Sequence, residues 1–164
     1  MKEVRNLNMP RRRYLLRCFI VLALLFLRSR TGHAATDPTL NAKLEDAIAN
    51  VRSGDSRMTR TEAAEHLAEL TRRVKPNSVD DKTVADMVSL LDIPDDSVRG
   101  WTAAALGHLG RRAKAAAPKL LALLAIVDCL EGDLTSAASI RPALERMGVK
   151  PPPAPSYNDC HKPK

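Results

Sequence analysis

Apolar residues recur at helical spacing from about residue 38 onward, and the first such stripe is clear. Its members share one face of a helix: Leu40, Leu44, Ala47, Ile48 and Val51. Asp37 before Pro38 suits a helix start, because an aspartate side chain caps free amides and proline needs no amide partner at the first position. Ser53-Gly54-Asp55 then ends the helix that this stripe predicts.

Two further stripes predict two further helices. The second stripe consists of Ala63, Ala64, Leu67 and Leu70, and the third of Val84, Met87, Val88 and Leu91. Thr59 and Glu62 have the spacing of a capping box before the second helix. Lys75-Pro76-Asn77 breaks that helix, and we expect Ser78 and Asp81 to cap the third.

The sequence repeats itself when it is shifted by 39 residues. The pairs in the first helix of each copy are Arg60 with Arg99, Ala64 with Ala103, Leu67 with Leu106 and Leu70 with Leu109. The next helix matches through Val84 with Leu123, Met87 with Ile126, Val88 with Val127 and Leu91 with Leu130. A partial third copy, at a shift of 38, places Leu144, Met147 and Gly148 under Leu106, Leu109 and Gly110. This period predicts helix pairs that each bury an apolar face on the next pair.

A repeat of about 40 residues is the period of HEAT and armadillo proteins. The second copy shows more of this pattern, in Asp95-Asp96, Val98-Arg99, Ala103-Ala104, Leu106-Gly107, Leu109-Gly110 and Pro118. It resembles the bacterial HEAT-like repeat, and the resemblance covers about residues 55–148. The resemblance implies an all-α fold, a short right-handed α-solenoid of about six helices within a domain over residues 35–150.

The net charge of +7 belongs to the start of the chain. Residues 1–34 contain eight basic residues and one acid, which leaves 18 of each sign in the remainder. Arginines followed by the apolar run Cys18–Leu27 and by Gly32-His33-Ala34 predict a signal peptide over residues 1–34, starting at Met1 or Met9. The alternative is an uncleaved N-terminal anchor. Either way we expect export, to the periplasm of a Gram-negative bacterium.

Cysteine usage agrees with export. Cys129 and Cys160 remain after the leader, and an even pair in an exported chain predicts a disulfide. This bond would tie the Pro-rich tail, residues 151–164, back onto the helical domain. The tail then either caps the end of the helices or presents a loop containing Tyr157 and Asn158 to a partner.

Catalytic and metal-binding motifs are missing from the sequence. His66 and His108 are expected on the polar sides of their helices, and HExxH, CxxC and GxSxG are not found. The adjacent Cys160 and His161 suggest a thiol nucleophile only weakly, because Cys160 is expected in the disulfide. We therefore expect no enzyme activity, no metal and no cofactor.

Charge alternates between the two kinds of turn. Turns inside a repeat are basic, with Arg72, Arg73, Lys75, Arg111, Arg112 and Lys114. Turns between repeats are acidic, with Asp92, Asp95, Asp96, Asp128, Glu131 and Asp133. Complementarity to the helix dipoles accounts for part of this pattern. Because the repeats stack, the charged turns predict a basic edge and an acidic edge on opposite ends of the helix layer. The acidic edge is our candidate for partner binding.

An exported helical repeat without a catalytic motif favours a protein-binding function. Size, export, disulfide and helical form make the chain similar to periplasmic immunity proteins that neutralise amidase effectors of type VI secretion. That similarity implies an inhibitor that occludes a secreted peptidoglycan amidase; the alternative is an envelope scaffold or adaptor. We expect no nucleic-acid partner, membrane contact only through the leader, and room for a homodimer through exposed terminal helices.

Overall fold

The computed structural model describes residues 37–129, 135–156 and 160, so the expected leader lies outside it. These residues form helices and no strand, which confirms the all-α fold class. The α-helices are α2 (Pro38–Ser53), α3 (Arg57–Arg72), α4 (Asp81–Ser89), α5 (Asp96–Leu109), α6 (Ala117–Val127) and α7 (Ala137–Arg146). Three 3-10 helices join them, namely η1 (Pro76–Ser78), η2 (Leu90–Asp92) and η3 (Gly110–Ala116).

Helix starts agree only partly with the sequence-based expectations. Asp37 caps α2 as predicted, accepting from the backbone nitrogens of Thr39 (3.0 Å) and Leu40 (3.2 Å). The capping box predicted for α3, Thr59 with Glu62, is wrong. Ser56 and Thr59 form the box instead, and each side chain accepts a hydrogen bond from the other residue's backbone nitrogen.

The cap of α4 differs as well. Asp80 occupies the N-cap position, and its side chain accepts from the backbone nitrogen of Thr83 at 2.7 Å. Ser78 instead belongs to η1, where its hydroxyl donates to the carbonyl oxygen of Lys75. The chain thus places a short 3-10 turn where the sequence predicted the helix start.

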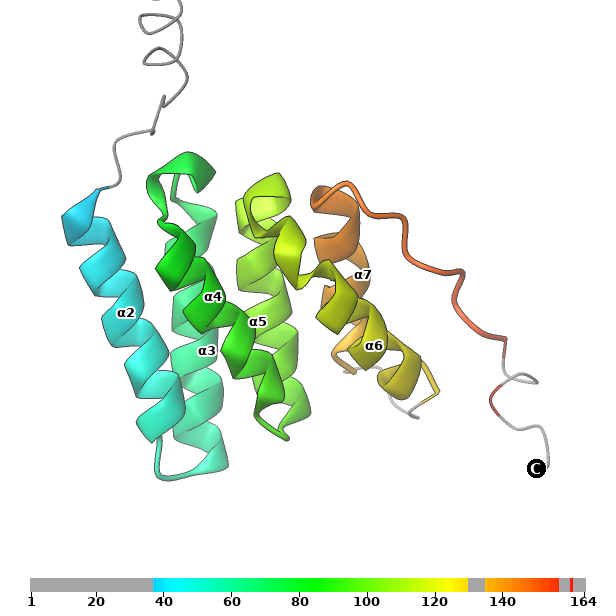
Figure 1. Cartoon of the computed structure of the whole chain (residues 1–164). Helices are drawn as coiled ribbons and strands as arrows, with labels where there is room; N and C mark the ends of the chain where they lie inside the picture. The colour runs from blue at the N-terminus through cyan, green and yellow to red at the C-terminus, as the bar shows by residue number, and fades with distance from the viewer. Residues whose placement is uncertain (1–36, 130–134, 157–159, 161–164) are drawn as a thin grey trace, which may run out of the picture. The chain divides into compact units, whose positions relative to one another are not determined.

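The helices pack in two rows. Helices α3, α5 and α7 contact one another in that order, while α2, α4 and α6 lie along one side of them (Figure 1). Helix α2 contacts both α3 and α4, α4 contacts α5, and α6 contacts α7. Central α5 therefore has a helix on either side within its own row.

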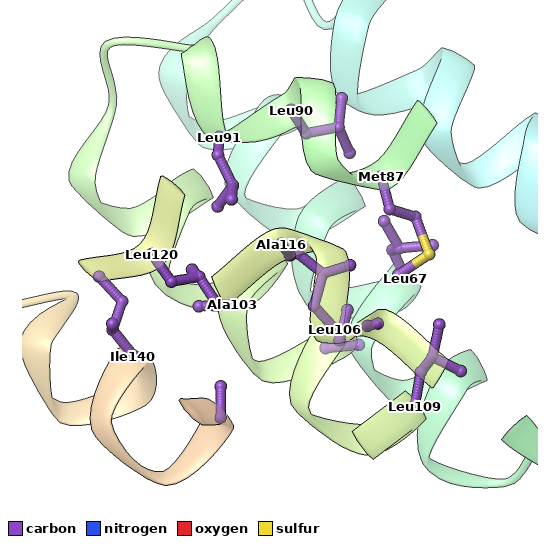
Figure 2. Packing of buried hydrophobic residues seen from close by; sticks show 14 of the residues in the cluster. Leu67, Met87, Leu90, Leu91, Ala103, Leu106, Leu109, Ala116, Leu120 and Ile140 are labelled. Carbon is purple, nitrogen blue, oxygen red and sulfur yellow. The ribbon is translucent and has the colours of Figure 1, made fainter. Parts of the chain in front are cut away.

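One apolar core joins these helices, and Figure 2 shows part of it, including Leu67 and Leu106. Leu67, Leu106 and Leu144 occupy equivalent repeat positions in α3, α5 and α7, and each has an exposed fraction of 0%. Gly110 and Gly148, at the ends of α5 and α7, both have positive φ, at 54° and 77°. The third copy is therefore equivalent to the second in structure at these positions.

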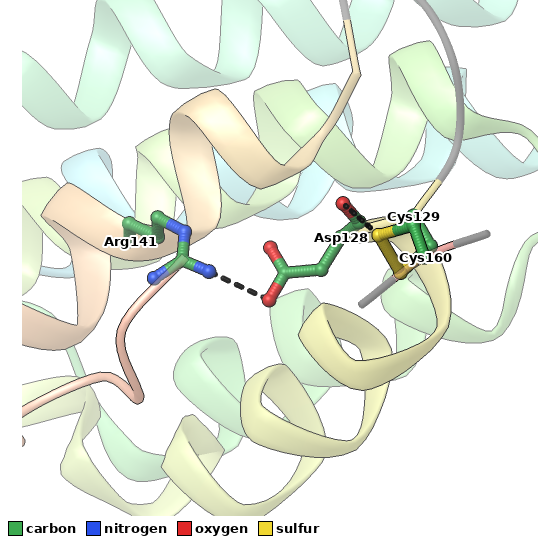
Figure 3. Close-up of a disulfide and its surroundings, with 4 residues drawn as sticks. All are labelled: Asp128, Cys129, Arg141 and Cys160. Carbon is green, nitrogen blue, oxygen red and sulfur yellow. Dashed lines mark hydrogen bonds and ion pairs between the residues drawn. A yellow bond between two sulfur atoms is a disulfide. The ribbon is translucent and has the colours of Figure 1, made fainter. Parts of the chain in front are cut away.

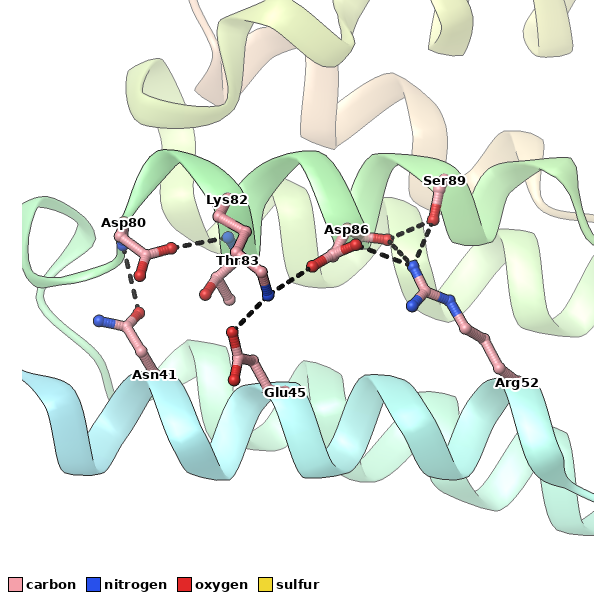
Figure 4. Close-up of polar contacts among 8 residues, drawn as sticks. All are labelled: Asn41, Glu45, Arg52, Asp80, Lys82, Thr83, Asp86 and Ser89. Atoms are coloured by element: carbon pink, nitrogen blue, oxygen red, sulfur yellow. Dashed lines mark hydrogen bonds and ion pairs between the residues drawn. The ribbon is translucent and has the colours of Figure 1, made fainter.

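Polar side chains join α2 to α4 on the surface (Figure 4). Lys82 donates to Glu45 at 2.6 Å and to Asp86 at 3.2 Å, and Arg52 donates to Asp86 at 3.1 Å. Hydrogen bonds from Arg52 and Lys82 lower the pKa of Asp86. Because Lys82 is exposed to solvent and Arg52 and Asp86 are partly exposed, water screens these pairs, and we expect them to add little to the stability of the fold.

Candidate functional site

The predicted acids that the structure describes lie before or at the start of α5 and after the end of α6. The start of α3 is at the same end, because Arg57 contacts Asp95, and we call this end of the helices the inter-repeat edge. Asp95 is the N-cap of α5 and accepts from the backbone nitrogens of Ser97 (3.0 Å) and Val98 (3.2 Å). Arg57 of α3 also contacts Asp95, with Nε 3.1 Å from Oδ2. The Asp95 side chain is only 9% exposed, so its charge mainly joins α3 to α5.

Asp96 joins α5 to α7. Its two carboxylate oxygens accept from the backbone nitrogen (2.8 Å) and the hydroxyl (2.5 Å) of Ser136, which lies at the start of α7. A carboxylate at a helix N-terminus satisfies a free amide and opposes the positive end of the dipole. Asp96 therefore acts as a cap that a neighbouring helix supplies.

Two further predicted acids differ in accessibility. Asp92 is 72% exposed and pairs with Lys119 at 2.7 Å. Asp128 is 11% exposed and pairs with Arg141 at 2.6 Å. Asp92 is thus the most accessible of the predicted acids that the structure describes, whereas Glu131, Asp133, Tyr157 and Asn158 lie outside the described residues.

A shallow groove of about 290 Å³ lies at the same edge, and the sequence interpretation did not identify it. Trp101, the one aromatic residue in the described part of the chain, is half-buried in it. The remaining lining comes from α3, α5 and the start of α7: Thr61, Asp96, Ser97, Gly100, Thr135, Ser136, Ala138 and Ser139. A lone tryptophan on the outward side of α5 was the available signal, but its neighbours come from two other helices.

The groove combines an aromatic ring with free hydroxyl groups. Within the described residues, the hydroxyls of Thr61, Ser97 and Ser139 have no hydrogen-bond partner. Met58 precedes Thr61 by three residues in α3, so it lies next to the groove on the helix surface, and it is 70% exposed. The edge therefore offers apolar area together with groups that can donate and accept hydrogen bonds.

The predicted disulfide between Cys129 and Cys160 is confirmed, with the two Cα atoms 5.2 Å apart (Figure 3). Arg141 of α7 adds two contacts near it, donating to Asp128 (2.6 Å) and to the carbonyl oxygen of Pro152 (2.5 Å). The tail is thus held at two places. Because Cys160 is oxidised in this bond, it has no thiol to act as a nucleophile.

The two described histidines have different surroundings. His66 is exposed, as the sequence predicted. His108 is half-buried instead, with Nδ1 3.1 Å from the carbonyl oxygen of Ala68 and 3.3 Å from Thr71 Oγ1. The prediction for His108 was wrong because α3 packs against that side of α5. Burial lowers the pKa of His108, and the nearby Arg146 and Arg72 lower it further.

The described residues contain no group of three or more His, Cys, Asp or Glu side chains that could hold a metal ion. No helix in this part of the chain is long and apolar enough to cross a membrane. Comparisons of the chain with known protein families, curated proteins and solved structures find no match.

Proposed function

We propose that the described helices form a short right-handed HEAT-like α-solenoid. Three features support this arrangement: the 39-residue repeat, the two rows of helices, and the equivalent buried leucines of α3, α5 and α7. Helix pairs that stack in this way depend on their neighbours for a core and leave long edges available for binding.

On this scaffold, we propose that the inter-repeat edge binds another protein. The observation that carries the proposal is the Trp101 groove beside exposed Met58. Tryptophan and methionine are enriched at protein interfaces, where a buried aromatic anchor commonly supplies much of the binding energy. The free hydroxyls around Trp101 would orient a loop of the partner that enters the groove.

The partner that we propose is a secreted peptidoglycan amidase, which this protein would inhibit as a periplasmic immunity protein. Expected export and the disulfide support an envelope location. Asp92, exposed at the same edge, would face a basic partner and steer its approach. No group of the chain carries out chemistry in this proposal: the edge blocks the access of substrate to the amidase.

The test is affinity capture from lysates of the native organism and its relatives with three oxidised baits. These are the wild type, Met58→Glu, and Ile126→Glu as the matched control. Ile126 is the other large apolar residue that is well exposed in the described part, at 64%, but it lies on α6. We expect the wild type and the control to retain an amidase, and Met58→Glu to lose it.

Trp101 provides a direct measurement, because it is the single tryptophan of the chain. When a partner without tryptophan covers the groove, the fluorescence emission of Trp101 should shift to shorter wavelength. In a separate assay, the captured enzyme should lose peptidoglycan hydrolysis when it is mixed with this protein at a one-to-one ratio. Capture of resident envelope proteins without a hydrolase would contradict the immunity function and favour the adaptor function. Equal capture by all three baits would exclude the inter-repeat edge as the binding surface.

A further inference from the structure

The opposite end of α3, α5 and α7 carries a group of exposed cations, which we call the basic edge. It consists of Arg73, Lys75, Arg111, Lys114, Arg146 and Lys150, all exposed. In the described part of the chain none of the six has an ion-pair partner. The nearby Arg72 and Arg112 are in ion pairs, with Glu69 and Asp81 respectively.

These cations converge although they come from different helices. Arg146 of α7 and Arg72 of α3 are close enough to His108 of α5 to lower its pKa further, after the effect of burial. The Arg111 side chain reaches Gly148, where its Nε lies 3.8 Å from the position of an added Cβ. The third repeat therefore extends a cluster that the sequence predicted from the first two.

Helix dipoles do not account for six free cations. Each helix C-terminus carries about half a negative charge, so three termini oppose only about one and a half positive charges. Two exposed acids oppose the cations at this end: Glu145, and Asp37, whose backbone nitrogen donates to the carbonyl oxygen of Ser78. The remaining positive potential is available for an anionic partner.

The composition of the edge favours a flat anionic surface as that partner. The large hydrophobic residues that are well exposed in the described part are Met58 and Ile126, and neither belongs to the basic edge. Binding there would depend on electrostatics and would need no pocket. Such contacts are typical of basic surfaces on anionic lipid.

We propose that the basic edge binds the surface of a membrane rich in anionic phospholipid. Membrane contact then extends beyond the leader, and the Trp101 groove at the other end of α5 faces away from the lipid. Helix α5 has 14 residues, which separates its two ends by about 21 Å.

The experiment uses the chain expected after removal of the signal peptide, residues 35–164, mixed with vesicles. Hydrogen exchange is compared on phosphatidylglycerol and on phosphatidylcholine vesicles. We expect slower exchange around residues 73–76, 111–115 and 146–150 on the anionic vesicles alone, with no change at the start of α5. Arg111→Gln/Arg146→Gln should abolish this protection and weaken vesicle binding by about 25-fold, about five-fold for each cation.

The matched control is Arg57→Gln/Lys119→Gln, which removes the same charge at the inter-repeat edge. It should keep the protection on anionic vesicles. Equal exchange on both kinds of vesicle would overturn the proposal. Protection by soluble polyglutamate but not by vesicles would also overturn it, and would assign the basic edge to an acidic protein.

Discussion

Gly107 of α5 lies directly against Ala143 of α7. A Cβ atom added to Gly107 would be 2.9 Å from both the Cα and the Cβ of Ala143, closer than side chains normally approach. Helix packing therefore requires a residue without a side chain at position 107. This contact also holds the third repeat close to the second, where the groove and the basic edge both cross from α5 to α7.

Gly107→Ala should lower the free energy of unfolding by about 1–3 kcal/mol, because the added methyl group overpacks a contact with backbone atoms. Urea unfolding followed by circular dichroism measures this change. The matched control is Gly100→Ala, seven residues earlier in the same helix, where the added Cβ would lie 3.6 Å from Ser136.

Gly100→Ala should leave stability unchanged or raise it by up to about 1 kcal/mol, since alanine is the better helix former. Both substitutions gain the same helix propensity, so their difference isolates the contact with Ala143. Equal stability of the two variants would show that α5 and α7 are not this close.

The two neighbouring acids of the inter-repeat edge should respond differently to substitution. Asp95→Ala removes the N-cap of α5 and its contact with Arg57, and we expect a loss of about 1–2 kcal/mol in the free energy of unfolding. Asp92→Ala removes only an exposed ion pair, and should change stability by less than about 1 kcal/mol. Thermal unfolding of the two variants at equal ionic strength is the measurement, and similar losses would contradict the capping role.

Reduction of the disulfide should lower the melting temperature by roughly 10 °C. The bond closes a loop whose ends are 31 residues apart, which corresponds to about 3–4 kcal/mol in the chain-entropy account. Calorimetry with and without reductant tests this for the wild type, and Cys129→Ser/Cys160→Ser should not respond to reductant. An unchanged wild-type melting temperature would mean that the disulfide contributes nothing to stability.

The sequence predicts the helix positions and the repeat because both follow from the periodicity of apolar residues. It predicts the disulfide because two cysteines remain after the leader. Leu67, Leu106 and Leu144 are identified as core by spacing alone, and all three are fully buried. The start of α2 at Asp37 could be predicted, but the start of α3 could not, because Ser56 and Thr59 are both good caps and local geometry selects between them.

The candidate site was harder to predict because its parts are distant in the sequence. Asp96 was identified as a binding acid, but its partner Ser136 is 40 residues away and occupies both of its oxygens. Trp101 lines a groove only because α3 and α7 pack on either side of α5. Contacts of this kind depend on tertiary packing, which the stripe pattern does not specify.

His108 should make stability depend on pH below neutrality. Its pKa is lowered in the folded protein, so the unfolded chain binds the proton more readily. Its contribution to stability is therefore complete above the unfolded pKa of about 6.5, and is lost as the pH falls from there through the folded value. Unfolding free energies measured between pH 5 and 8 should fall on the acid side in the wild type.

His108→Gln should make this dependence shallower, because glutamine can still donate to the carbonyl oxygen of Ala68 but does not titrate. His66→Gln is the control, since His66 is exposed on α3 and should leave the dependence as it is in the wild type. Protonation of His108 would also place a further positive charge beside Arg72 and Arg146, which opposes folding in the same direction. A wild-type curve without an acid slope, or a slope that His108→Gln retains, would show that His108 is not the group responsible.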